Sequence, residues 1–128
     1  MNLLLDTHAL IFWLLASPRL SRAARDAIAD SDNTIWVSAV SGFEVTRKFQ
    51  LGKLPEADNF ASDVGGFAVG EGFLLLDVGI AHAETAGRFD NPHRDPFDRL
   101  LIAQALTENL TLISNERLFD GFGVKRLW

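Results

Sequence analysis

Short apolar runs alternate along the chain with longer stretches in which apolar residues recur at helical spacing. The short runs are rich in Leu, Ile and Val and are bounded by polar or turn-forming residues, as buried β-strands are. We predict five strands on this basis: Leu3–Leu5, Thr34–Val37, Phe73–Leu76, Thr111–Ser114 and Val124–Leu127.

The stretches between these runs carry helical periodicity and helix-end signals. Ser21 and Ser38 are suited to cap helices, and Gly52 follows the end of the second one. Asp95-Pro96 is typical of a helix start, because Asp accepts from free amides and Pro has no N–H to lose. We predict the following helical segments: Ala9–Ala16, Ser21–Ala29, Ser38–Leu51, Pro55–Val69, Ile80–Arg88, Asp95–Asn109 and one turn at Glu116–Phe119.

The alternation of strands and helices predicts an α/β fold. Its central sheet should be mainly parallel, with about five short strands, and covered by helices on both faces. Residues 1–128 have the length of one domain. In such folds, functional sites lie beyond the carboxyl ends of the strands.

The composition is that of an ordinary globular protein and excludes sites that depend on cysteine. Hydrophobic residues make up 48% and charged residues 23%, and cysteine is absent, which excludes disulfides and thiolate metal sites. The N-terminal segment reaches Asp6 before an apolar signal-peptide core develops. No apolar run approaches the roughly 18–20 residues of a membrane span, so we expect a cytoplasmic protein without a membrane partner.

The net charge of −5, taken alone, argues against a nucleic-acid partner. Carboxylates that converge on a divalent cation would nevertheless invert the local charge where a phosphate binds. The overall charge therefore leaves the substrate open.

Four acidic residues fall where this topology places functional sites. Asp6 ends the first predicted strand, and Glu44 lies on the helix after the second. Asp98 is near the start of the helix before the fourth strand, and Glu116 follows that strand. Because the carboxyl ends of parallel strands share one edge of a sheet, these acids are expected to converge.

Two of the acids occupy core-facing helix positions. Glu44 follows Val40 by four residues, and Asp98 precedes Leu101 and Ile102 by three and four. Carboxylates in such positions are costly unless they are paired or bind cations. Hard oxygen ligands favour Mg²⁺ or Mn²⁺ over zinc. Two such ions about 3.5–4 Å apart could activate water and stabilise both oxygens of a phosphodiester displacement.

Each acid also has a structural interpretation. Asp6 could cap the next helix, and Glu116 could be a first-turn helix residue. Glu44 could pair with Lys48 one turn later on a solvated face.

The Asp95–Arg99 segment allows a similar alternative. Asp98 could serve only the helix dipole or pair with Arg99. Asp95 is better suited to cap the helix than to bind metal, but it is the reserve ligand if Asp98 faces away. The three histidines do not cluster in the sequence, and we interpret them as structural or surface residues: His8, His82 and His93.

Four segments resemble the sequence blocks of PIN-domain proteins, in the family's order and from one end of the chain to the other. The third is the most specific match and is typical of a VapC-type subgroup of toxins. The segments are Leu3–Trp13 (LLLDTHALIFW), Ser38–Leu54 (SAVSGFEVTRKFQLGKL), His93–Leu106 (HRDPFDRLLIAQAL) and Leu110–Phe119 (LTLISNERLF).

This resemblance implies a three-layer α/β/α domain that cleaves single-stranded RNA with Mg²⁺ or Mn²⁺. The family's acidic positions match Asp6, Glu44 and Asp98, with Glu116 as the fourth. The last position departs from the pattern, because Glu replaces the more usual Asp and its longer side chain could reach metal through water. The hydroxyls of neighbouring Thr7 and Ser114 are expected to orient the acids or metal-bound waters.

The resemblance also implies a cognate antitoxin, with DNA contacted only through that partner, and a homodimer. We expect the antitoxin to lay a helix between segments 9–16 and 39–51 and to insert a basic residue among the acids. Apolar residues of these segments, some of them exposed, would form this groove: Trp13, Val40, Phe43 and Val45. An overlapping set would contribute to a dimer interface: Phe12, Trp13, Phe43, Phe49, Leu51 and Leu54.

Two other classes of protein remain as alternatives. In a receiver-type phosphoacceptor domain, Asp77 would follow a strand as the phosphoacceptor. That class expects paired acids after the first strand, whereas Asp6 is followed by Thr7 and His8, and it expects a lysine after a late strand, which is missing. The other alternative is a PIN-like binding module without catalysis.

Overall fold

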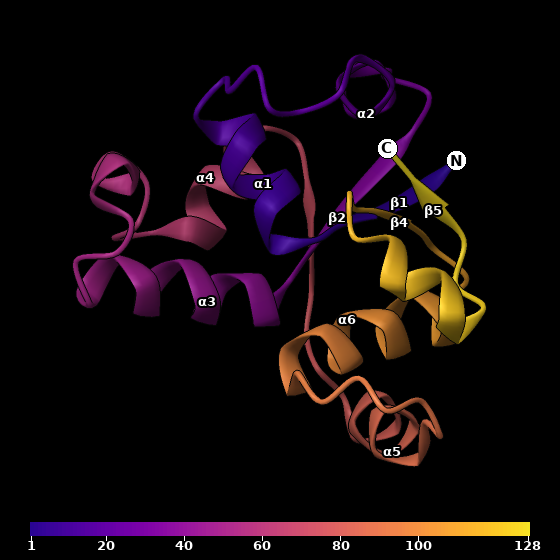
Figure 1. The fold of residues 1–128 in the computed structure, drawn as a ribbon. Helices are drawn as coiled ribbons and strands as arrows, with labels where there is room; N and C mark the ends of the chain where they lie inside the picture. Colours follow the sequence, from indigo (N-terminus) through magenta and orange to yellow (C-terminus); the bar gives the residue numbers. More distant parts are fainter.

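The computed structural model describes residues 1–128 and contains one sheet of five parallel strands. The strand order is β3-β2-β1-β4-β5, so the N-terminal strand lies at the centre (Figure 1). The strands are β1 Asn2–Leu5, β2 Thr34–Ser38, β3 Leu74–Leu76, β4 Thr111–Ile113 and β5 Arg126–Leu127. The predicted parallel sheet is confirmed.

Helices connect the strands and cover both faces of the sheet (Figure 1). The α-helices are α1 Thr7–Leu14, α2 Arg22–Ala29, α3 Ala39–Gln50, α4 Val64–Gly70, α5 Ile80–Arg88 and α6 Pro96–Thr107. Two short 3₁₀ segments are η1 Pro55–Ala57 and η2 Arg117–Phe122. No helix combines the length and the apolarity needed to cross a membrane.

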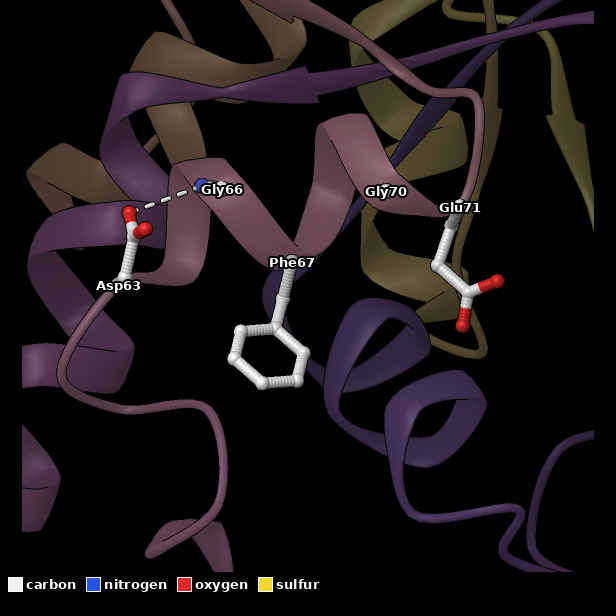
Figure 2. A pocket seen from close by; sticks show the side chains of 5 residues that line it. All are labelled: Asp63, Gly66, Phe67, Gly70 and Glu71. Carbon is white, nitrogen blue, oxygen red and sulfur yellow. Dashed lines mark hydrogen bonds between the residues drawn. The ribbon is translucent and has the colours of Figure 1, made fainter.

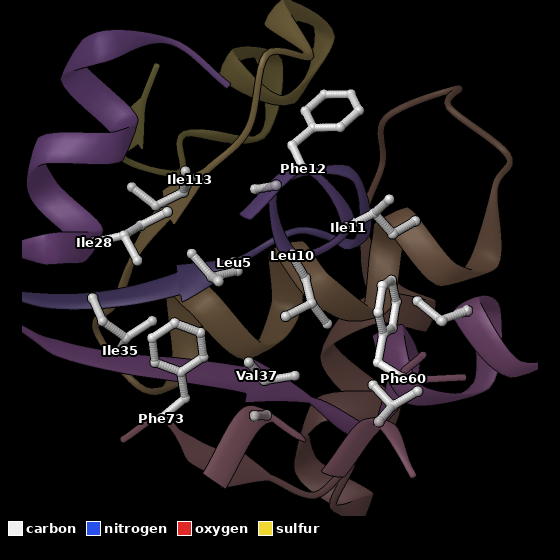
Figure 3. Close-up of a cluster of buried hydrophobic side chains, with 14 of the residues drawn as sticks. Leu5, Leu10, Ile11, Phe12, Ile28, Ile35, Val37, Phe60, Phe73 and Ile113 are labelled. Atoms are coloured by element: carbon white, nitrogen blue, oxygen red, sulfur yellow. The ribbon is translucent and has the colours of Figure 1, made fainter. Parts of the chain in front are cut away.

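Two hydrophobic clusters lie on the two faces of the sheet. Leu3 and Leu5 belong to the larger cluster, with residues of α1, α2 and α4. Figure 3 shows Leu5 in this cluster beside Leu10 and Ile28. Leu4, the residue between them, points into the smaller cluster, with α6. The alternation of side chains along a strand explains why consecutive leucines serve different layers. Together with α5, which packs against α6, this gives the expected three-layer α/β/α arrangement.

The expected helix over Pro55–Val69 is wrong. Only the first three residues form a 3₁₀ turn, and α4 begins later, at Val64. Asp63 caps α4 by accepting a hydrogen bond from the Gly66 N–H at 2.9 Å. A Cβ at Gly66 would collide with the Asp63 carboxylate, so a glycine permits this close approach. Helical spacing in this stretch reflects burial of separate turns, not one continuous helix.

The sheet places the starts of several helices at one edge. β1 is followed directly by Asp6 and α1, and β2 by α3. The backbone N–H of Asp6 donates to Ile113 O at 3.0 Å, which joins the end of β1 to the end of β4. The predicted site residues therefore come to the carboxyl edge of the sheet.

Candidate functional site

Asp6 is the most buried of the four predicted acids, with 5% of its surface exposed. Its Oδ1 accepts a hydrogen bond from the Ala9 N–H at 2.8 Å, so it caps α1 as well as lining the site. Burial raises the pKa of Asp6, hydrogen bonds from Ser114 and Ala9 lower it in part, and the charge of Asp98 raises it further.

Glu44 lies on α3 and is held by a hydroxyl from α1. Thr7 Oγ1 donates to Glu44 Oε1 at 2.6 Å and lies 3.0 Å from Ser41 Oγ. Partial burial raises the pKa of Glu44, although the Thr7 hydrogen bond and Lys48 lower it in part, while the charges of Asp98 and Asp95 add to the increase. Lys48 makes no ion pair with Glu44 at contact distance, so the solvated-pair interpretation is not supported.

Asp98 faces the other acids from the first turn of α6. Burial raises its pKa, a hydrogen bond from His93 lowers it, and repulsion from Asp95 and Glu116 raises it again. Asp95 is the helix cap, because its Oδ1 accepts from the N–H groups of Phe97 and Asp98 at 2.9 and 3.2 Å. The charge of Asp98 is felt at both Asp6 and Glu44.

Glu116 follows β4 and caps η2. Its Oε1 accepts from the Leu118 N–H at 3.1 Å, and its own N–H donates to Ser114 Oγ at 3.0 Å. Ser114, which directly follows β4, is fully buried. Its side chain forms hydrogen bonds with both Asp6 and the Glu116 N–H. Asp98 thus interacts electrostatically with each of the other three predicted acids.

The chemistry of these side chains fits a hard cation, since all the donors are carboxylate oxygens. No three of the His, Asp and Glu side chains form a ready set of ligands for one ion. One oxygen of each acid is already hydrogen bonded, whereas Glu44, Asp98 and Glu116 each keep a second oxygen without a partner.

Sequence reasoning missed His93, which it treated as structural or surface. His93 Nε2 lies 2.9 Å from Asp98 Oδ2, and both side chains are half-buried. The ring packs edge-on against Phe119 and Phe122. The only sequence signal was its membership of the same family-like block as Asp98.

The loop that carries His93 is anchored by Arg99. This guanidinium donates to four backbone oxygens at the end of α5 and in the following loop: Ala86 at 3.1 Å, Phe89 at 2.6 Å, Asn91 at 2.9 Å and His93 at 2.8 Å. Arg99 therefore does not pair with Asp98, as the alternative interpretation of that acid required.

The apolar surface beside the acids is smaller than expected. Phe43 is 54% exposed and lies against Phe97, with ring centroids 5.3 Å apart. Val40 and Val45 are buried, and Trp13 is half-buried, so the expectation that these residues line a groove is wrong for the two valines.

Other surface features lie apart from the acids. An open hollow of about 510 Å³ lies over α4 and is lined by Asp63, Gly66, Phe67, Gly70 and Glu71 (Figure 2). Asp77 is exposed after the edge strand β3, away from the centre of the sheet where a phosphoacceptor would lie.

Comparison with known proteins finds this fold in the PIN domain family and in several solved structures. The PIN domain family model matches residues 3–125. A VapBC2 structure from Rickettsia felis, bound to a promoter DNA fragment, has a chain with a TM-score of 0.75 and 17% identity, covering 99% of this chain and 98% of that one. For VapBC-1 from nontypeable Haemophilus influenzae, the TM-score is 0.69, the identity 15% and the coverages 99% and 97%. For a toxin–antitoxin complex from Klebsiella pneumoniae, the TM-score is 0.55 and the identity 20%, and the match covers 88% of this chain and 85% of that one. No curated protein sequence matches the chain.

Proposed function

Because the chain belongs to the PIN domain family, we propose that it is a metal-dependent endoribonuclease and the cytoplasmic toxin of a toxin–antitoxin pair. The observation that carries this proposal is the convergence of four acids from four separate segments, with burial and mutual repulsion raising the pKa of three of them. Groups kept at such a cost to stability are typical of functional sites.

Asp6, Glu44 and Asp98 would hold Mg²⁺ or Mn²⁺, with Glu116 contributing directly or through water. The bound cation would supply an activated water and neutralise negative charge on the phosphodiester. The number of ions, one or two, depends on whether Glu116 is a direct ligand.

The chain's own contribution is to hold these carboxylates in place. Thr7 fixes one oxygen of Glu44, and His93 fixes one oxygen of Asp98. Ser114 and the first turn of α1 hold Asp6. Each contact restrains a side chain that would otherwise turn away from its charged neighbours, so the acids are oriented before substrate arrives.

Hydrolysis of RNA should require added Mg²⁺ or Mn²⁺ and stop in EDTA. The products should carry 5′-phosphate and 3′-hydroxyl ends. Asp98→Asn should abolish cleavage, whereas Asp77→Asn, which removes an exposed acid away from the site, should not. Sequencing of RNA ends after induced expression would identify the target.

Cyclic-phosphate ends would contradict this mechanism. A folded protein that binds RNA but never cleaves it would support the non-catalytic module instead.

The toxin role is supported by the similar structures, which are toxin–antitoxin complexes. We propose that the antitoxin places an arginine among the acids and an apolar residue on the Phe43–Phe97 pair. Contact with DNA would be made by the antitoxin. Co-expression of the adjacent small open reading frame should yield a complex, and Phe43→Ser should weaken it. If nothing co-purifies and the chain alone leaves growth unaffected, the toxin role fails even if nuclease activity survives.

A further inference from the structure

A second hollow opens directly beside the acids. Its volume is about 520 Å³, within the roughly 300–1,000 Å³ range of ligand-binding clefts. It is lined by Asn91, Pro92, His93, Arg117, Leu118 and Gly121. His93 is also the hydrogen-bond partner of Asp98, and Arg117 directly follows Glu116. The hollow and the acid cluster therefore share a wall.

Both walls of this hollow are held by arginines whose donors are already used. Arg99 fixes the loop of Asn91 and His93 through their backbone oxygens. On the other side, Arg126 forms hydrogen bonds of 2.8 and 3.0 Å with the carboxylate of Asp120 and donates to Ser114 O. A hollow between fixed walls can bind a ligand with little ordering cost.

Arg117 is the cation left available in this hollow. It is exposed and forms no ion pair, because the neighbouring Asp120 is engaged by Arg126. Leu118 beside it is 65% exposed. With the half-buried ring of His93, the hollow thus combines a free guanidinium, an apolar surface and a flat ring.

We propose that this hollow binds a nucleotide of the single-stranded RNA adjacent to the cleaved bond, with Arg117 on a phosphate. The inference rests on the proposed nuclease function. A guanidinium matches phosphate geometry, and bases pack on flat or apolar side chains in single-strand binding sites. The protein has a net charge of −5, which repels the RNA backbone. A cation next to the acids would offset this repulsion where the RNA must approach them most closely.

The test uses the full-length chain with Asp6→Asn as background, because Asp6 does not line the hollow and its loss prevents cleavage. A fluorescein-labelled ten-nucleotide RNA is titrated in Mg²⁺ at several salt concentrations, with anisotropy as the readout. Arg117→Ala should weaken binding about tenfold. It should also reduce the slope of log affinity against log salt by about 0.7, the value for one phosphate contact on a single strand.

Two further variants separate this effect from loss of charge or of fold. Arg22→Ala removes another exposed arginine, on α2, and should change neither affinity nor slope. Leu118→Ser, at an exposed position, removes apolar surface but no charge, so it should weaken binding without changing the slope. Wild-type affinity and slope in Arg117→Ala would overturn the inference while the nuclease proposal stands. Absence of both RNA binding and cleavage in the unaltered protein would overturn both.

Discussion

At the scale of single residues, the main feature is a set of acids whose negative charge destabilises the folded protein in the absence of metal. Asp6 shows this most clearly. It is almost fully buried, and burial is the largest cause of its raised pKa. One of its oxygens also caps α1. The hydrogen bond of this cap stabilises the fold, whereas the buried charge destabilises it.

Asp6→Asn separates these two effects. Asparagine can cap the helix equally well but carries no charge. We expect the melting temperature in EDTA to rise, by roughly 4 °C for each kcal/mol gained. The increase that Mg²⁺ or Mn²⁺ gives to the unaltered protein should disappear. The Asp77→Asn variant should behave like the unaltered protein in both conditions. An unchanged metal response in Asp6→Asn would contradict its role as a ligand.

The pH dependence of stability follows from the raised pKa values of Asp6, Glu44 and Asp98. Over the range above the ordinary carboxyl pKa of about 4, the folded state binds more protons than the unfolded state. Stability in EDTA should therefore fall as pH rises from this value through the raised pKa values, and then level off. Saturating Mg²⁺ should remove the fall, because a cation favours the charged forms. Urea denaturation from pH 4 to 8 measures both curves, and identical curves would count against a metal site.

At the scale of elements, the sequence predicted the strands and most helices because their signals are local. Ser21, Ser38 and Asp95 cap the helices where expected. The helix predicted to begin at Ala9 begins at Thr7, since Asp6 provides the cap. The error at residues 55–69 arose because separate turns that bury apolar side chains imitate helical spacing.

The positions of the four predicted acids in the fold follow from similar local signals: Asp6 and Glu116 come after strands, Asp98 lies in the first turn of α6, and Glu44 lies on the helix after β2. Their role as ligands stays a prediction. The position of His93 was not predictable, because its contact with Asp98 depends on a loop without regular structure. That loop takes its shape from hydrogen bonds to Arg99, which helical periodicity does not reveal.

Arg99→Ala should therefore loosen the loop between α5 and α6. Four backbone oxygens would lose their donor, and we expect a loss of about 2–3 kcal/mol in the free energy of unfolding. Arg99→Lys should recover only part of it, because an ammonium cannot span the same acceptors. Arg88→Ala, which removes an exposed arginine from α5, is the matched control. Hydrogen exchange should show faster amides in residues 89–94 only in the Arg99 variants, and unchanged exchange there would refute the anchoring role.

At the scale of the whole molecule, the exposed apolar surface bears on self-association. Of the residues expected at an interface, Phe43 and Leu51 are exposed, whereas Phe12 and Leu54 are buried in the core. Further exposed apolar side chains lie on the edge strand β3 and at the start of α5: Leu74, Leu75, Val78 and Ile80. An edge strand with such residues is a surface that proteins usually cover.

We expect a homodimer in sedimentation experiments at tens of micromolar protein. The double variant Leu75→Ser/Ile80→Ser should shift the equilibrium to monomer without loss of melting temperature beyond that caused by dissociation. Leu106→Ser, at an exposed position on α6, should leave the mass unchanged. A monomeric mass for the unaltered chain would contradict the dimer.

The pairing of the first strand with the fourth has a consequence for the timing of synthesis. β1 pairs with β4, and Asp6 donates its N–H to Ile113, more than a hundred residues later. A ribosome that has made most of the chain has therefore made Asp6, Glu44 and Asp98 but not the strand that brings Ser114 and Glu116 beside them. Contacts between distant parts of a chain form only when both parts are available. The four acids therefore cannot come together until β4 has been made, so a chain that stops before that strand lacks the site that we propose.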